Sequence, residues 1–185
     1  GQDRELVLFG AGHVGLAVAR LGHFAGFAVT VWDERPEFAS SERFPEARVL
    51  ACPLDRVFEE GLRLSEGSFV VIATRGHALD TAVAKALDGL PAAYIGMIGS
   101  RKKIATVREA LRRNGVSQEH LNRLFQPIGL PIGAETPEEI AISVLSEIIA
   151  VSSGADLRSL RAPLSQGGTP VSPHFEGASA DTSRP

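Results

Sequence analysis

The chain is short of cysteine and of long apolar runs. Its 185 residues contain one cysteine, Cys52, so by itself it forms neither an internal disulfide nor a cysteine-rich zinc or iron–sulfur centre. Its apolar runs fall far below the roughly 20 residues that span a bilayer. The first residues also lack the pattern of a signal peptide. We therefore expect a cytoplasmic protein with no membrane partner.

A strong excess of one charge is also absent. The sequence has 19 Lys and Arg residues against 22 Asp and Glu residues, a net charge of −3. Because such a chain lacks a broad positive field, we expect no nucleic-acid partner. The motifs of a nucleophile elbow, a zinc protease helix and a P-loop are missing as well. We therefore expect no catalytic residue and no metal ligand from these classes.

Strand-like and helix-like patterns alternate along the chain. Apolar runs predict strands over 6–9, 28–32, 48–50, 69–73, 93–98 and 125–130, and helical periodicity predicts helices over 14–24, 78–87, 103–113 and 136–152. Short apolar strands that alternate with helices are typical of a buried parallel sheet. The fold class predicted is α/β: a doubly wound, Rossmann-like parallel sheet in the order 3-2-1-4-5-6, with helices on both faces.

The composition changes near Gly154. Pro, Gly, Ser and Thr are frequent after this point and no periodicity is visible. We therefore divide the chain into a Rossmann-like cofactor- or nucleotide-binding domain over residues 1–154 and a flexible C-terminal tail over residues 155–185.

The first predicted turn, residues 10–15, reads GAGHVG and matches G-x-G-x-x-G between a strand and a helix. Gly10 permits the tight turn, Gly12 lets the backbone approach a pyrophosphate, and Gly15 lets the helix sit close to the strand. The helix start then attracts the anion. The same pattern also occurs in turns that bind nothing, and His13 more often fills space than acts in catalysis.

Asp33 ends the second predicted strand, where an acid usually accepts hydrogen bonds from an adenosine ribose. It could also cap the next turn without binding a ligand. Arg35 lies two residues further and could pair with a ribose 2′-phosphate, so the sequence leaves NAD and NADP open.

Polar groups also follow the later strands at the same sheet edge. They are Thr74, Arg75, Gly76 and His77 after the fourth strand, Gly99, Ser100, Arg101, Lys102 and Lys103 after the fifth, and Glu135 after the sixth. Cations are disfavoured at a helix start, so the run 101–103 makes sense if a phosphate sits among them. The alternative is a solvated basic face.

Five motifs in the same order resemble one known family. They are 9–15 (FGAGHVG), 33–38 (DERPEF), 74–77 (TRGH), 94–103 (YIGMIGSRKK) and 127–141 (PIGLPIGAETPEEIA). Together they resemble the C-terminal Rossmann domain of XdhC-type xanthine dehydrogenase accessory factors, which are related to the CoxF and CoxI maturation proteins. Full-length members carry another domain before this unit, and none precedes Leu6 in the sequence as given, so contacts from such a domain are not assigned.

The resemblance implies a role in the maturation of molybdenum hydroxylases. Such factors bind molybdenum cofactor (molybdopterin), hold it during sulfuration and deliver it to the apoenzyme. The implied partners are a molybdenum hydroxylase apoenzyme such as xanthine dehydrogenase and a cysteine desulfurase, and a homodimer is an expected assembly. The residues expected to bind the cofactor are Gly10, Gly12, His13, Val14, Gly15, Asp33, Arg35, Thr74, Arg75, Gly76, His77, Gly99, Ser100, Arg101, Lys102 and Glu135.

Two other functions stay open at this point. One is an NAD(P)-dependent oxidoreductase. Two features argue against it: the sequence has no Tyr-x-x-x-Lys pair, and its one tyrosine, Tyr94, lies inside a predicted strand. The other is a nucleotide-sensing module that would keep the glycine turn and tolerate loss of the charges at 101–103.

Overall fold

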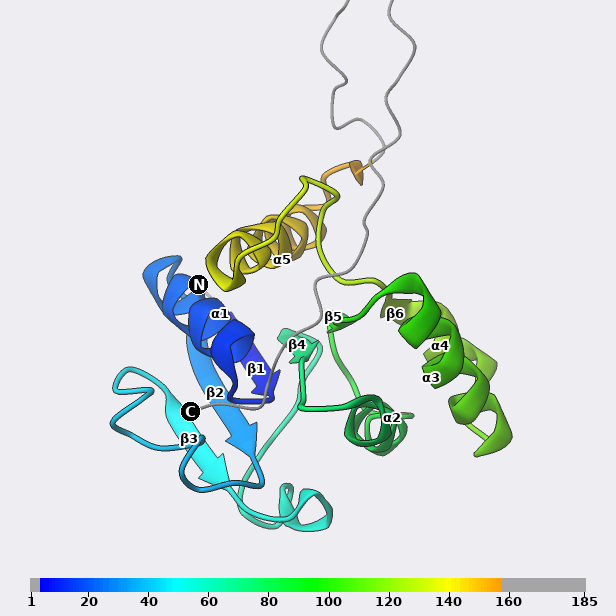
Figure 1. Ribbon diagram of the computed structural model, residues 1–185, viewed down its shortest axis with the longest axis horizontal. Helices are drawn as coiled ribbons and strands as arrows, with labels where there is room; N and C mark the ends of the chain where they lie inside the picture. Colours follow the sequence, from blue (N-terminus) through cyan, green and yellow to red (C-terminus); the bar gives the residue numbers. More distant parts are fainter. Residues whose placement is uncertain (1–3, 158–185) are drawn as a thin grey trace, which may run out of the picture.

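The structure, a computed structural model, describes residues 4–157 (Figure 1). It contains a six-stranded parallel sheet in the order β3-β2-β1-β4-β5-β6, so the predicted fold class and strand order are confirmed. The strands are β1 (Glu5–Phe9), β2 (Ala28–Asp33), β3 (Arg48–Ala51), β4 (Ser68–Ile72), β5 (Tyr94–Met97) and β6 (Leu124–Phe125). Of the tail predicted over 155–185, positions 158 onward lie outside the described residues.

Helices cover both faces of the sheet. One face packs against α1 (His13–Phe24) and α5 (Pro137–Ser153), and the other against α2 (His77–Ala86), α3 (Arg101–Arg113) and α4 (Gln118–Arg123). A short 3-10 helix, η1 (Leu54–Arg56), follows β3. The alternation of side chains in β1 divides the two cores: Leu6 and Leu8 lie in the first, and Val7 and Phe9 in the second. Within residues 4–157, no helix is both long and apolar enough to cross a membrane.

The predicted start of α5 is confirmed in detail. The hydroxyl of Thr136 accepts a hydrogen bond from the backbone N–H of Glu139, and the Glu139 carboxylate accepts one from the N–H of Thr136. This reciprocal capping box, with Pro137 next to it, fixes the helix start. Helix α3 begins two residues earlier than its apolar pattern indicates, because Ser100 accepts a hydrogen bond from the N–H of Lys103 and becomes the N-cap.

The sixth strand is the clearest difference from the sequence prediction. It ends at Phe125 rather than at residue 130. Pro127 has no N–H to donate to a sheet, and Leu130 donates its N–H to the carbonyl of Ser143 in α5 instead. The chain therefore leaves the sheet edge and turns onto α5. The sequence analysis also missed the short helix α4, whose N-cap is Ser117.

Candidate functional site

The loops after β2, β1 and β4 begin side by side at the carboxyl edge of the sheet. The N–H of Gly10 donates to the carbonyl of Trp32 at 2.8 Å, and the N–H of Ala73 donates to the carbonyl of Phe9 at 2.8 Å. After the adjacent strands β1 and β4 the chain goes to opposite faces, into α1 and α2 respectively. This edge is therefore the topological switch point, where open α/β sheets bind ligands.

The glycine turn after β1 is shaped by close backbone contacts. Gly10 has φ +122°, and a Cβ atom there would lie 2.1 Å from the carbonyl oxygen of Ala73. A Cβ atom on Gly15 would lie 2.2 Å from the carbonyl oxygen of Gly10. Only glycine fits at these two positions, which agrees with the turn geometry that the sequence predicted for them. Gly12 is buried, and its backbone, with φ −76° and ψ −163°, has a conformation that other residues also adopt.

The two helices that begin at the switch point lack a side-chain cap. Gly12 precedes α1 and Gly76 precedes α2, and neither offers an oxygen to the first turn. Of the five α-helices in residues 4–157, the other three are capped by a hydroxyl, from Ser100, Ser117 and Thr136. First-turn N–H groups have no partner within the helix, and the helix dipole makes this end positive. Both helix starts thus suit an anion bound between them.

Asp33 binds the glycine turn and Arg35 together. Its Oδ2 accepts from the N–H of Ala11 and from Nη2 of Arg35, each at 3.0 Å, and its Oδ1 accepts from the N–H and Nε of Arg35 at 3.0 and 2.9 Å. Burial by itself would raise the pKa of Asp33, but the hydrogen bonds from Arg35 and Ala11 outweigh it and lower the pKa below its ordinary value. Asp33 is 3% exposed and stays ionised at neutral pH.

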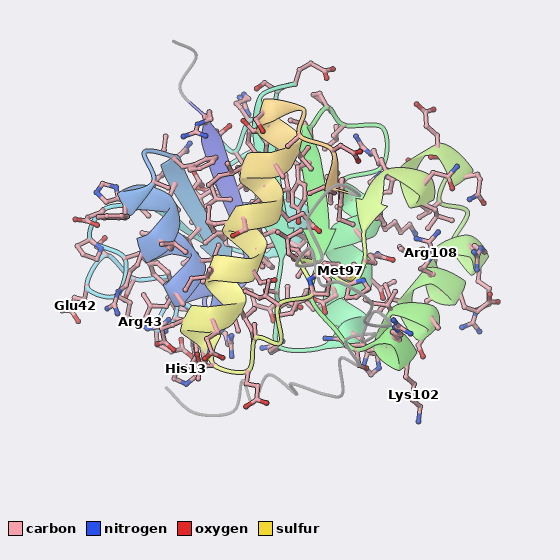
Figure 2. All side chains as sticks on the ribbon, turned by 90° about the horizontal axis from the view of Figure 1, so that it is seen from above. His13, Glu42, Arg43, Met97, Lys102 and Arg108 are labelled. Atoms are coloured by element: carbon pink, nitrogen blue, oxygen red, sulfur yellow. The ribbon has the colours of Figure 1, made fainter. Side chains whose placement is uncertain are left out.

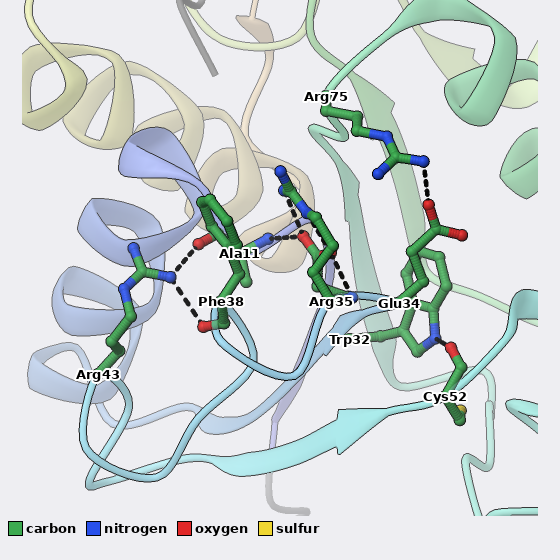
Figure 3. A network of polar contacts seen from close by, with 9 residues as sticks. Ala11, Trp32, Glu34, Arg35, Phe38, Arg43, Cys52 and Arg75 are labelled. Atoms are coloured by element: carbon green, nitrogen blue, oxygen red, sulfur yellow. Dashed lines mark hydrogen bonds and ion pairs between the residues drawn. The ribbon is translucent and has the colours of Figure 1, made fainter. Parts of the chain in front are cut away.

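Arg43, which the sequence analysis missed, supports the other side of the turn. Its Nη1 donates to the carbonyl oxygens of Ala11 and Phe38 (Figure 3). Burial lowers the pKa of Arg43, as do the charges of Arg35 and Arg20, while Asp33 opposes the shift. The residue lies in a segment without periodicity, so only its position in the fold reveals the contact.

A second ion pair crosses the end of β1. Arg75, in the loop after β4, binds the carboxylate of Glu34, which follows β2 (Figure 3). Since β2 and β4 flank β1 in the sheet, the pair spans the edge next to the glycine turn. Arg75 was a predicted site residue and Glu34 was not.

The three cations at the start of α3, at positions 101–103, have two different environments. Nζ of Lys103 lies 3.0 Å from Oδ2 of the fully buried Asp80, an ion pair whose geometry falls outside that of a hydrogen bond. Oδ1 of Asp80 accepts from the N–H and the hydroxyl of Thr74 at 3.0 and 2.5 Å. Lys103 is therefore a structural counter-ion. The side chains of Arg101 and Lys102 are exposed, and Lys102 points away from the molecule at the edge that also carries His13 (Figure 2).

The other predicted site residues are placed in different ways along this edge. Val14 is buried on the first turn of α1, and His77 is exposed on the first turn of α2. Gly99 has φ +149°, and a Cβ atom there would lie 3.0 Å from Cδ of Lys103. Glu135 is exposed and donates its N–H to Glu139 at 2.8 Å, so its backbone belongs to the cap of α5.

A family model and several known proteins are similar to most of this chain. Residues 6–148 match the family model described as XdhC Rossmann domain. YqeB of Escherichia coli K12, described as uncharacterized, is 40% identical over 159 residues, which are 84% of this chain and 28% of YqeB. A protein of Bacillus subtilis 168 that is described as a probable xanthine dehydrogenase subunit is 34% identical over 146 residues, 78% of this chain and 42% of that protein.

A solved structure gives the same relationship. The crystal structure of a xanthine dehydrogenase from Bacillus halodurans matches with a TM-score of 0.70 at 27% identity, over 87% of this chain and 45% of that one. The chain thus spans less than half the length of each of these three proteins.

Proposed function

The chain belongs to the XdhC Rossmann-domain family, and we propose that it is the cofactor-holding unit of an accessory factor for molybdenum hydroxylases of the xanthine dehydrogenase type. In this proposal the carboxyl edge binds molybdenum cofactor, or a nucleotide cofactor that also carries phosphate, for delivery to the apoenzyme. The relatives support this client, since two of them are described as a xanthine dehydrogenase or part of one.

One observation carries the proposal. Among the α-helices of residues 4–157, the starts without side-chain caps are those of α1 and α2, which flank the switch point between β1 and β4. A capping hydroxyl at either start would satisfy a backbone N–H that a phosphate could otherwise bind. The glycine turn brings the backbone itself to this position, because Gly10 and Gly15 leave no room for larger residues.

The described residues fit a phosphate-bearing cofactor. The first-turn N–H groups of α1 would hold its phosphate. The N–H groups of Arg35 that do not contact Asp33 would bind a second polar group of the cofactor. Molybdopterin supplies a phosphate ester for this binding and a molybdenum centre that acts in the client enzyme. In this role the chain itself binds and orients the cofactor.

The position of Tyr94 supports binding rather than oxidoreductase catalysis. It is the one tyrosine of the sequence, is 2% exposed, and donates its hydroxyl to Glu147 at 2.6 Å between the sheet and α5. Burial and the Glu147 carboxylate raise the pKa of Tyr94 far above its ordinary value. A substrate at the carboxyl edge would therefore not receive a proton from this hydroxyl.

The proposal is tested by anaerobic binding of molybdopterin to the full chain, measured by mass spectrometry of the retained cofactor. Gly12→Ala keeps a backbone conformation that alanine also adopts, and should reduce retention because a methyl group blocks the approach of phosphate. Gly67→Ala is the matched control, because its Cβ atom would meet only the Ser65 hydroxyl, at an ordinary 3.7 Å.

Cofactor retention by the wild type and by Gly67→Ala, together with a decrease in retention of about tenfold or more in Gly12→Ala, would support phosphate binding at the glycine turn. Failure of the wild type to retain any phosphate-bearing cofactor would contradict it. Oxidation of a small substrate with NAD(P) as the sole cofactor would replace the accessory role with an enzymatic one.

A further inference from the structure

The carboxylate of Asp33 has no acceptor site left for a ligand. A carboxylate offers about four lone-pair positions, and four donors already occupy Asp33: the N–H of Ala11 and the N–H, Nε and Nη2 of Arg35, all at 2.9–3.0 Å. Two of the donors belong to the backbone of the turns that the site is built from. A ribose diol, which recognises an acid by donating both hydroxyl hydrogens, would find this acid saturated.

Arg35 is the group that faces outward from this pair. A guanidinium has five N–H bonds, and only two of them, one on Nε and one on Nη2, are used by Asp33. Its carbon atom lies 3.7 Å from the centre of the Phe38 ring, which holds the plane in place. The hydrogen bonds to Asp33 and the contact with Phe38 fix the direction of the remaining N–H bonds, and the side chain is 17% exposed.

The neighbouring charges leave this outward side cationic in character. Arg43 lies over the same Phe38 ring, 5.3 Å from its centre, and its backbone contacts position it beside the glycine turn. Of the acids that influence Arg35, Asp33 is saturated, Glu34 is bound by Arg75, and Glu37 is exposed. Two oriented guanidinium groups next to a phosphate-binding turn favour a second anion over a neutral diol.

On the premise of the proposed function, we infer that the position at the end of β2 takes a phosphomonoester through Arg35 rather than a ribose diol through Asp33. A ribose 2′-phosphate has this chemistry, as has the terminal phosphate of a pterin cofactor. Arg35 is then the residue that determines specificity, and Asp33 is the positioning residue that aims it.

The test compares NADP⁺ and NAD⁺, which differ only in the 2′-phosphate, by isothermal titration of the full chain. We expect NADP⁺ to bind about tenfold or more tightly, the size typical of a charge-assisted pair of hydrogen bonds. Arg35→Gln should abolish the preference and strengthen NAD⁺ binding, because it frees oxygens of Asp33 for the diol. Arg35→Lys keeps a positive charge but lacks the paired N–H donors of a guanidinium, so it should retain a reduced preference for NADP⁺. This variant keeps the test decisive if Arg35→Gln does not fold.

Arg56→Gln is the control, since Arg56 lies on η1 and pairs only with the surface residues Glu59 and Glu60 in the contacts described. It should leave both affinities unchanged. A molybdopterin titration separates the two phosphate sources. Weaker molybdopterin binding in Arg35→Gln than in the wild type would show that Arg35 binds the pterin phosphate. Unchanged molybdopterin binding, with the NADP⁺ preference lost, would show that Arg35 binds the ribose 2′-phosphate.

If the wild type binds NAD⁺ as tightly as NADP⁺ or more tightly, the inference is overturned, but phosphate binding at the glycine turn is not. An unchanged preference for NADP⁺ in Arg35→Gln would have the same consequence. If molybdopterin alone binds, unchanged binding in Arg35→Gln likewise overturns the inference only. Failure of NADP⁺, NAD⁺ and molybdopterin to bind would overturn the proposed function and the inference together.

Discussion

Lys103 places its ammonium 3.0 Å from the carboxylate of Asp80, so the first turn of α3 neutralises a charge that is wholly buried behind β4. The same carboxylate binds the N–H and hydroxyl of Thr74. One buried acid therefore joins the loop after β4, helix α2 and helix α3. Two of the loops at the carboxyl edge are held in position by this contact.

We expect Lys103→Met to lower the free energy of unfolding by about 3 kcal/mol, at the low end for breaking a buried ion pair, because the methionine leaves Asp80 without a counter-ion. Urea unfolding followed by circular dichroism measures the change. Lys102→Met is the matched control on the adjacent, exposed position and should change stability by at most about 0.5 kcal/mol. Equal effects of the two substitutions would show that the ion pair contributes nothing.

Tyr94 should make the protein sensitive to alkaline pH. Burial and the Glu147 carboxylate raise the pKa of Tyr94 far above its ordinary value of 10.0. Above about pH 10 the unfolded chain therefore loses a proton that the folded chain keeps, and the free energy of unfolding falls as pH rises. Thermal melting at pH 8 and pH 10.5 should show a smaller decrease in Tyr94→Phe than in the wild type. The same decrease in both proteins would contradict this account.

His120 should make the protein sensitive to mild acid. It is 1% exposed, its Nε2 lies 2.6 Å from the carbonyl oxygen of Ala84, and its Nδ1 accepts from Nε of Arg123 at 2.9 Å. Nδ1 therefore carries no hydrogen, and the ring is neutral. Burial lowers the pKa of His120, and the charge of Arg123 lowers it further.

Because the pKa of folded His120 is depressed, the unfolded chain binds a proton below about pH 6.5 that the folded chain does not, and stability falls as pH falls. Melting temperatures between pH 7 and pH 5 should decrease less in His120→Gln than in the wild type. His23→Gln, at a histidine that is 47% exposed, should keep the wild-type slope. A wild-type slope in His120→Gln would assign the acid sensitivity to other groups.

Much of the fold follows from short patterns in the sequence. The apolar runs, the helical periodicity and the glycine spacing act over a few positions, and each predicted elements that the structure contains. The prediction was wrong for the end of β6 and missed α4. Those depend on contacts with distant residues, such as the hydrogen bond from Leu130 to Ser143.

For the candidate site, residue type and order along the chain already indicated which loops meet at one edge, since parallel strands bring their carboxyl ends together. How each side chain is used there was decided by the tertiary structure. Arg35 saturates Asp33, Lys103 neutralises Asp80 and Arg43 supports the glycine turn, and in the last two cases the partners lie 23 or more positions apart. Burial makes an unpaired charge costly, so the partner that the fold brings near, rather than the local sequence, determines which cations remain available to a ligand.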